Sequence, residues 1–134
     1  MKSVFLFLGA FSALLAVAFG AFGAHALKSI LSPELMLTYQ TAVNYQMWHA
    51  LGLIGISFIQ QQNPESKLVK WSGRLMFIGI LVFSGSLYLL ALFNIKELGM
   101  ITPIGGVSFM IAWALLAIFS TKKQQKSRYN SARR

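Results

Sequence analysis

The chain contains 134 residues, of which 56% are hydrophobic and 11% are charged, and its formal net charge is +9. Soluble domains carry roughly 25% charged residues, so this composition excludes a soluble globular domain. The hydrophobic content also excludes a disordered chain, and the absence of cysteine excludes disulfides and thiolate chemistry. With a mean hydropathy of +0.62, the composition predicts an integral membrane protein.

Four long apolar runs, free of charged residues, divide the chain. As a helix rising about 1.5 Å per residue, each run can cross a hydrocarbon core of roughly 30 Å. None alternates polar and apolar residues as a membrane β-strand does. We therefore expect an all-α fold, an integral membrane bundle of four transmembrane helices over residues 1–120, with a basic tail over residues 121–134. The expected spans are residues 4–27, 39–59, 75–93 and 101–120.

The three prolines indicate where helices begin. Pro33, Pro64 and Pro103 each follow a Ser, Asn or Thr, and such a residue caps a helix whose first turn accepts proline. We therefore expect the second, third and fourth helices to begin near residues 33, 64 and 103. The polar tail from Thr121 onward is expected to be loosely ordered.

The distribution of Lys and Arg predicts the orientation. Four spans place both termini and the middle loop on one side, which then holds ten Lys and Arg residues against only Lys28 and Lys96 opposite. Because cytoplasmic loops are enriched in these residues, we expect both the N- and the C-terminus to be cytoplasmic. The ten are Lys2, Lys67, Lys70, Arg74, Lys122, Lys123, Lys126, Arg128, Arg133 and Arg134.

A cleaved signal peptide is an alternative reading of the N-terminus. Lys2, the apolar stretch and Ala24-His25-Ala26 imitate a signal peptide with its cleavage site. The apolar stretch is longer than the roughly 7–15 residues of a signal peptide. We therefore favour a retained first span.

Small residues form two stripes at helical spacing. In membranes such stripes let helices approach closely, so we expect helix packing, within one subunit or between subunits; a ligand groove is the alternative. The stripe of the first helix comprises Gly9, Ala13, Ala16, Gly20 and Ala24, and that of the last comprises Gly105, Ser108 and Ala112.

Polar side chains are concentrated in the second helix, where lipid offers them no partner. Tyr45 and His49 share one face, and His49 falls near the middle of the bilayer. We expect the small residues of the first helix to close over these two rings. His49 is expected to be a structural hydrogen-bonding group; a proton-handling or ligand-binding role is the alternative, since an intramembrane ionisable residue is a functional candidate.

Two further groups of polar residues are candidates. Ser84, Ser86 and Tyr88 indicate either packing or a bend with a polar lining. His25 lies about 15 Å in depth from His49, so no shared metal site and no cofactor are expected. The candidate residues for a polar cluster or a ligand are His25, Gln40, Thr41, Asn44, Tyr45, Gln46, His49, Ser84, Ser86 and Tyr88.

The sequence lacks the residues of common catalytic sites. It contains no aspartate, and its three glutamates lie in the expected connectors. No paired carboxylates, acidic partner for a serine and histidine, or glycine-rich phosphate loop is present. We therefore expect no enzymatic activity. The basic tail is expected to contact anionic lipid rather than nucleic acid.

Four segments, one in each expected helix, stand out together: Gly20-Ala-Phe-Gly-Ala-His25, Tyr45-Gln46 with His49-Ala-Leu51, Phe83-Ser-Gly-Ser-Leu-Tyr88 and Thr102-Pro-Ile-Gly-Gly-Val-Ser-Phe109. They resemble the YgdD/YwdK family of small bacterial inner-membrane proteins. The resemblance implies a multi-pass protein of the bacterial cytoplasmic membrane, and it carries over no activity.

Two classes of function remain open. The first is a structural membrane protein, or one that binds a lipid, a small ligand or a partner, with its polar cluster around Tyr45 and His49. The second is a small transporter or pore, which would require a homo-oligomer because four helices enclose little volume. The lack of an intramembrane carboxylate favours the first class.

Overall fold

The computed structural model describes residues 3–133, apart from the side chains at positions 124, 125, 127 and 128. Within these residues all regular structure is helical and no strand is formed, which confirms the all-α prediction. Lys2, Arg134 and the side chain of Arg128, counted above for orientation, lie outside the described part. The elements are α1 (Val4–His25), η1 (Leu27–Ser29), α2 (Pro33–Gln62), α3 (Lys67–Gly79), η2 (Ile80–Ser84), α4 (Gly85–Phe93), η3 (Lys96–Met100) and α5 (Thr102–Ala132).

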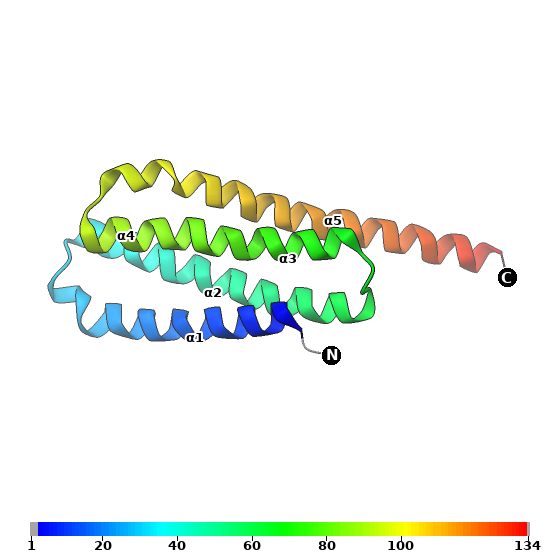
Figure 1. Ribbon diagram of the computed structural model, residues 1–134, viewed down its shortest axis with the longest axis horizontal. Helices are drawn as coiled ribbons and strands as arrows, with labels where there is room; N and C mark the ends of the chain where they lie inside the picture. The colour runs from blue at the N-terminus through cyan, green and yellow to red at the C-terminus, as the bar shows by residue number, and fades with distance from the viewer. Residues whose placement is uncertain (1–2, 134) are drawn as a thin grey trace.

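The long helices run antiparallel to their neighbours, side by side (Figure 1). Helix α1 packs along α2, α2 packs along the α3–α4 segment, and that segment packs along α5. The segment is one continuous rod, in which Ile80–Ser84 forms a π-helical turn. Both ends of the chain lie at one end of the bundle, together with the connector between α2 and α3.

Serine side chains cap the starts of three helices, and the first is α1, where the Oγ of Ser3 accepts from the N of Leu6 at 3.3 Å. The Oγ of Ser32 accepts from the backbone N of Leu35 at 3.3 Å, and α2 begins at Pro33 as predicted. The expected start of the third helix at Pro64 is wrong. Pro64 lies in a turn, and α3 begins at Lys67, where the Oγ of Ser66 accepts from the N of Val69 at 3.4 Å. The serine directly before the helix has replaced Asn63 as the cap.

The expectation of a loosely ordered tail is also wrong for the described residues. Helix α5 continues without interruption from Thr102 to Ala132 and extends beyond the other helices (Figure 1). No glycine or proline occurs between Val107 and Ala132, and Lys, Gln and Arg are good helix formers. The polar residues from Thr121 onward therefore continue the same helix as the apolar run before them.

Three helical segments of the described chain are long and apolar enough to cross a membrane: Val4–His25, Lys67–Phe93 and Lys96–Lys123. Helix α2, which contains the expected span 39–59, is not among them although it has 30 residues. Its polar side chains lower its hydropathy. Large hydrophobic side chains are exposed on every long helix; Phe7, for example, is 66% exposed. Water-soluble monomers rarely expose such large apolar areas, so this surface suits lipid.

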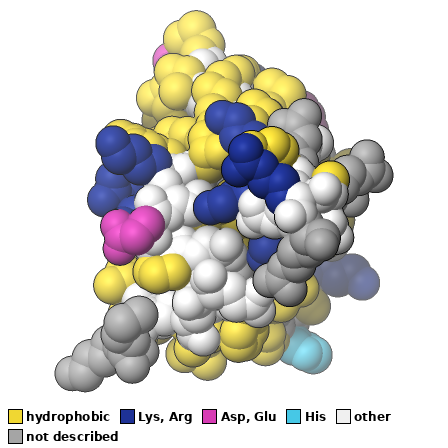
Figure 2. Space-filling view, turned by 90° about the vertical axis from the view of Figure 1, so that its right-hand side faces the viewer, with side chains coloured by type: hydrophobic (Ala, Val, Ile, Leu, Met, Phe, Trp, Pro, Cys, Tyr) yellow, Lys and Arg dark blue, Asp and Glu magenta, His cyan; other side chains and the backbone are white. Residues whose placement is uncertain are grey.

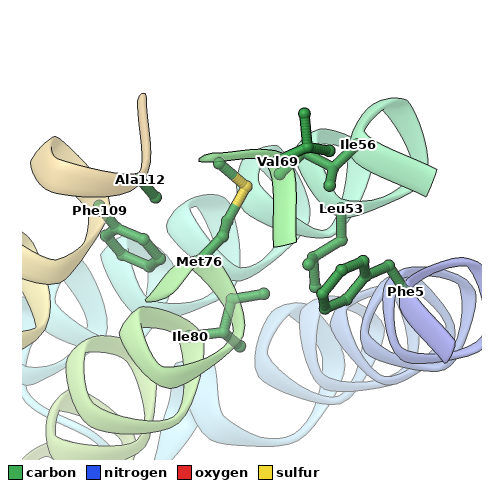
Figure 3. Close-up of a cluster of buried hydrophobic side chains, with 8 residues drawn as sticks. All are labelled: Phe5, Leu53, Ile56, Val69, Met76, Ile80, Phe109 and Ala112. Atoms are coloured by element: carbon green, nitrogen blue, oxygen red, sulfur yellow. The ribbon is translucent and has the colours of Figure 1, made fainter. Parts of the chain in front are cut away.

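The hydrophobic core consists of two clusters, one toward each end of the bundle. The larger joins α1, α2, α3, η2 and α5 (Figure 3), and the smaller contains Leu27, Tyr39 and Ala91. Between the two clusters, polar side chains of α2 and α4 reach neighbouring helices. The larger cluster comprises Phe5, Leu53, Ile56, Val69, Met76, Ile80, Phe109 and Ala112.

Candidate functional site

Gln46 is the centre of a polar cluster inside the helix bundle. This buried side chain donates from Nε2 to the backbone O of Ser12 in α1 at 2.9 Å. Its Oε1 accepts from the hydroxyl of Tyr88 in α4 at 2.7 Å. One amide group thus hydrogen-bonds to both neighbouring helices, because an amide carries a donor and an acceptor in one plane. The cluster is centred on Gln46 rather than on Tyr45 and His49.

Tyr88 lies among aromatic rings. Its ring packs edge-on against Phe19 at 5.2 Å and against Tyr39 at 5.3 Å between centroids. The hydroxyl of Tyr39 in turn donates to the backbone O of Phe19 at 2.6 Å. These edge-to-face contacts hold the Tyr88 hydroxyl in the direction of Gln46.

Serine hydroxyls link the α3–α4 segment to both of its neighbours. Ser84, in the π-helical turn, donates to the backbone O of Ala42 in α2 at 2.8 Å. The hydroxyl of Ser86 lies 2.7 Å from that of Thr102 at the start of α5. Ser72 donates to the O of Ala112 at 2.7 Å, farther along the same interface. Ser84 and Ser86 therefore occupy different faces of the segment, one toward α2 and one toward α5.

Tyr45 and His49 face away from α1, so the expectation that small residues of α1 close over them is wrong. The ring of His49 stacks on Phe109 of α5 at 3.5 Å between centroids, and Tyr45 stacks on Phe83 at 4.4 Å. The Nδ1 of His49 lies 2.7 Å from the backbone O of Tyr45, within α2 itself. The rings lie against the aromatic residues of η2 and α5, because these offer stacking faces that a row of small residues lacks.

The small residues of α1 instead approach the backbone and small side chains of α2. A Cβ added at Gly9 would lie 2.8 Å from the backbone O of Ala50, and one at Gly20 would lie 3.4 Å from Val43. Ala16 is only 1% exposed, whereas Ala13 is half-buried. Ala24 is exposed, so its assignment to the packing stripe is wrong.

Gly23, rather than Ala24, faces α2 and contacts the ring of Tyr39. With 3.6 residues per turn, the residue that faces α2 after Gly20 is three positions later and not four. The stripe of α5 lies against the α3–η2 segment. Gly105 contacts the backbone of Phe83, Ser108 donates to the O of Leu75 at 2.6 Å, and Ala112 is fully buried.

Besides Tyr45 and His49, four candidate residues make no hydrogen bond to the described residues of the neighbouring helices. His25 is exposed at the last residue of α1, near the negative end of the helix dipole. Thr41 donates to the O of Leu37 in its own helix at 3.0 Å. Gln40 and Asn44 are exposed and line a shallow cavity of about 280 Å³ beside α1.

Four members of the interhelical network are not among the residues that the sequence indicated: Ser12, Tyr39, Ser72 and Thr102. Ser12 lies between Gly9 and Ala13 in the small-residue stripe, which is the signal that could have placed its backbone next to α2. Tyr39 and Thr102 stand at the edges of apolar runs, where a polar residue usually reads as an interfacial one.

The buried polar side chains of the bundle are fully hydrogen-bonded. Among the described residues, no buried side-chain nitrogen or oxygen lacks a hydrogen-bond partner. In the same part of the chain, no three His, Cys, Asp or Glu side chains come together in a way that could hold a metal ion. A cavity of about 220 Å³ opens between α1 and the η2–α4 segment, with Gln46 and Tyr88 in its wall. The side-chain polar atoms of Gln46 and Tyr88 at this cavity are already hydrogen-bonded, to each other and to the backbone of Ser12.

Residues 19–106 match the model of a family described as "Protein of unknown function (DUF423)". This region contains Gln46, Ser84 and Tyr88. The chain belongs to the DUF423 family. Members with curated names are similar over almost their whole length, although no solved structure matches the chain.

A UPF0382 membrane protein of Staphylococcus epidermidis is 50% identical to this DUF423 protein over 119 residues, covering 89% of this chain and 96% of that one. UPF0382 membrane protein YwdK of Bacillus subtilis is 45% identical, covering 89% and 97% of the two chains. The resemblance to the YgdD/YwdK family is thereby confirmed. With relatives named as membrane proteins and several apolar helices of membrane length, this DUF423 member is a multi-pass bacterial membrane protein.

Proposed function

We propose that this DUF423 protein is a four-span, non-enzymatic protein of the bacterial cytoplasmic membrane that binds membrane lipid on its outer surface. The observation that carries the proposal is the pairing of its interior polar atoms: no buried side-chain nitrogen or oxygen of the described residues lacks a partner. A satisfied interior offers little for chemistry or for a polar ligand. Recognition then falls to the apolar surface and to the grooves between helices.

The chain path supports α2 as the fourth span. Helix α1 is long and apolar enough to cross the membrane, and α2 returns along it for about 45 Å at 1.5 Å per residue. Helix α3 then begins at the end of the bundle where α1 began (Figure 1). A chain that crosses in α1 and starts α3 on the original side has crossed back in α2. The hydrogen bonds of Gln46 and the stacking of His49 account for polar residues in that span.

The charge of the two bundle ends supports cytoplasmic termini. Lys and Arg side chains gather at the end where the chain begins (Figure 2). The opposite end carries Lys28 in η1 and Lys96 in η3. Cytoplasmic surfaces are the ones enriched in Lys and Arg, so we propose that the N-terminus, the α2–α3 connector and the end of α5 are cytoplasmic.

Cysteine labelling tests this orientation cleanly, because the natural chain has no cysteine. Glu65→Cys lies in the α2–α3 connector, and Glu97→Cys lies in η3; both positions are exposed. In intact cells, a membrane-impermeant maleimide is expected to label Glu97→Cys and to label Glu65→Cys only after lysis. Labelling of Glu65→Cys from outside would overturn the topology.

We propose that the polar cluster is structural and that the protein is not an enzyme. Transport and proton transfer in membrane proteins often use an intramembrane carboxylate. The four apolar runs contain none: Glu34 lies in the first turn of α2, and Glu65 and Glu97 lie in connectors.

Transport through a homo-oligomer is the alternative, in which the path would be lined by Tyr45, His49, Ser84, Ser86 and Tyr88. It has less support because His49 packs on Phe109 and Tyr88 binds Gln46. We propose that the basic end of α5 contacts anionic lipid and not nucleic acid.

Native mass spectrometry tests lipid binding. The protein is released in the mass spectrometer from nanodiscs that contain phosphatidylglycerol and phosphatidylcholine. The activation energy is set to the value that removes all detergent from a separate, detergent-purified sample. The lipid molecules that remain bound to the chain at this energy are counted. We expect at least one lipid to stay bound. Release of the bare chain alone under these conditions would contradict the proposal.

A further inference from the structure

A groove of about 600 Å³ lies between the start of α1 and residues 70–78 of α3. Phe5 and Leu8 of α1 form an apolar wall, and α3 lines the other side with Lys70, Trp71, Arg74 and Phe77. It lies at the basic end of the bundle, where α1 begins and α3 begins (Figure 1). One side of the groove therefore suits hydrocarbon and the other suits an anion.

The two cations of the groove act from one face of α3. Lys70 and Arg74 are four residues apart, a spacing that places side chains next to each other on a helix. The guanidinium of Arg74 lies over the ring of Trp71, 5.1 Å from its centroid, which restricts its position. No Asp or Glu lines the groove, so the lining itself supplies no carboxylate to neutralise the two charges.

The apolar wall is built by a close contact between helices. A Cβ added at Gly73 would lie 2.5 Å from the ring of Phe5, so glycine lets the phenylalanine of α1 lie flat against α3. Phe5 is 8% exposed and belongs to the core, and it therefore gives the groove a firm base. Trp71 is exposed beside it, as is typical of tryptophan at the level of lipid headgroups.

We infer that the α1–α3 groove binds one anionic phospholipid of the cytoplasmic leaflet, with its phosphate at Lys70 and Arg74 and an acyl chain along Phe5 and Leu8. The inference rests on the proposed lipid-binding function and adds a site and a headgroup charge to it. A free anion would leave the apolar wall uncovered, and a zwitterionic lipid would leave a net positive charge in the groove. An anionic lipid matches both sides.

The test compares bound lipid after release from nanodiscs of equal phosphatidylglycerol and phosphatidylcholine content. We expect the wild-type chain to retain phosphatidylglycerol in preference to phosphatidylcholine. In the double variant Lys70→Gln/Arg74→Gln, the preference is expected to fall about fivefold for each cation removed. The matched control is Lys28→Gln/Lys96→Gln, which removes two exposed cations from the opposite end of the bundle. It should keep the preference.

A second variant separates the groove from the general charge of the surface. Leu8→Trp places a larger side chain in the groove without changing its charge, and it should reduce the number of lipid molecules retained. Addition of excess inorganic phosphate should leave the wild-type preference unchanged; its loss would indicate a site for free phosphate and overturn the lipid assignment.

The two proposals fail in different ways. Lipid retained without a preference for phosphatidylglycerol, or a preference that both double variants lose equally, would overturn the groove site and leave general lipid binding intact. A wild-type chain released without any lipid would overturn the proposed function itself. Folding of each variant is checked by its thermal unfolding in detergent.

Discussion

The hydroxyl of Tyr88 donates a hydrogen bond of 2.7 Å to the Oε1 of Gln46, which lies 42 residues earlier in the chain. Because the same amide also donates to the backbone of Ser12, this contact ties three helices together near the middle of the bundle. In lipid such bonds are worth about 0.6 kcal/mol each on average, since the separated helices also find partners. Their larger contribution is to fix which faces of the helices meet.

The first prediction concerns this contact. Gln46→Leu removes both interhelical bonds and leaves the buried Tyr88 hydroxyl unpaired, so it should lower the free energy of unfolding by roughly 1–3 kcal/mol. Gln40→Leu, at an exposed position of the same helix, should change it little. Thermal unfolding in detergent measures both. In Gln46→Leu/Tyr88→Phe the combined loss should be smaller than the sum of the single losses, and strict additivity would show that the two groups are not coupled.

A second prediction compares two glycines of the membrane helices. Gly9→Ala places a methyl group 2.8 Å from the O of Ala50, a backbone atom that cannot move alone, so overpacking should cost about 1–3 kcal/mol. Gly55→Ala meets no atom within 4 Å and should stabilise the helix by about 0.5–1 kcal/mol. Unfolding of the two variants by sodium dodecyl sulfate titration provides the measurement. Equal changes in the free energy of unfolding of the two variants would contradict a close α1–α2 contact at Gly9.

A third prediction tests the same interface with larger side chains. Ala16 is 1% exposed and Val17 is 62% exposed, although they are adjacent in sequence. Ala16→Leu should therefore force α1 away from α2 and cost about 1–3 kcal/mol. Val17→Leu points to lipid and should be neutral. If both variants unfold at the wild-type temperature, α1 does not rest on α2 at this level.

The fourth prediction separates structure from chemistry at His49. Its ring stacks on Phe109, and its Nδ1 contacts a backbone oxygen within its own helix. His49→Phe keeps the stack and should stay within about 1 kcal/mol of the wild type. His49→Ala empties the space between α2 and α5 and should cost roughly 2–5 kcal/mol. A folded His49→Phe protein that no longer retains lipid would give the imidazole a role in binding.

The sequence predicts the helical class and the start of α2, because the length of an apolar run and a Ser-Pro pair each determine structure within a single segment. It does not predict which face of α2 meets α1. Gln46 is a single position away from Tyr45, and both faces carry polar groups. The choice depends on where Phe83 and Phe109 lie, and these belong to other helices.

The two errors at helix ends have local causes of another kind. Asn63 and Ser66 are both good capping residues, three positions apart, and only the geometry of the turn selects Ser66. In the tail, the polar and basic sequence suggests a loosely ordered chain, yet Lys and Arg do not break a helix. Helix α5 accordingly ends at Ala132 and not at the edge of the apolar run.

The π-helical turn at Ile80–Ser84 determines how this segment tolerates insertions and deletions. A π-helical turn holds one residue more than an α-helical turn, so deleting one residue there would restore regular α-geometry and leave the flanking residues nearly on their present faces. Tyr88 would then still lie toward Gln46, and Ser86 toward Thr102. Inserting one further residue would instead rotate α4 by about 100° relative to α3 and separate both pairs. Exchanging the exposed Leu81 for another apolar residue has no such effect. We therefore expect this turn to lose a residue more readily than it gains one.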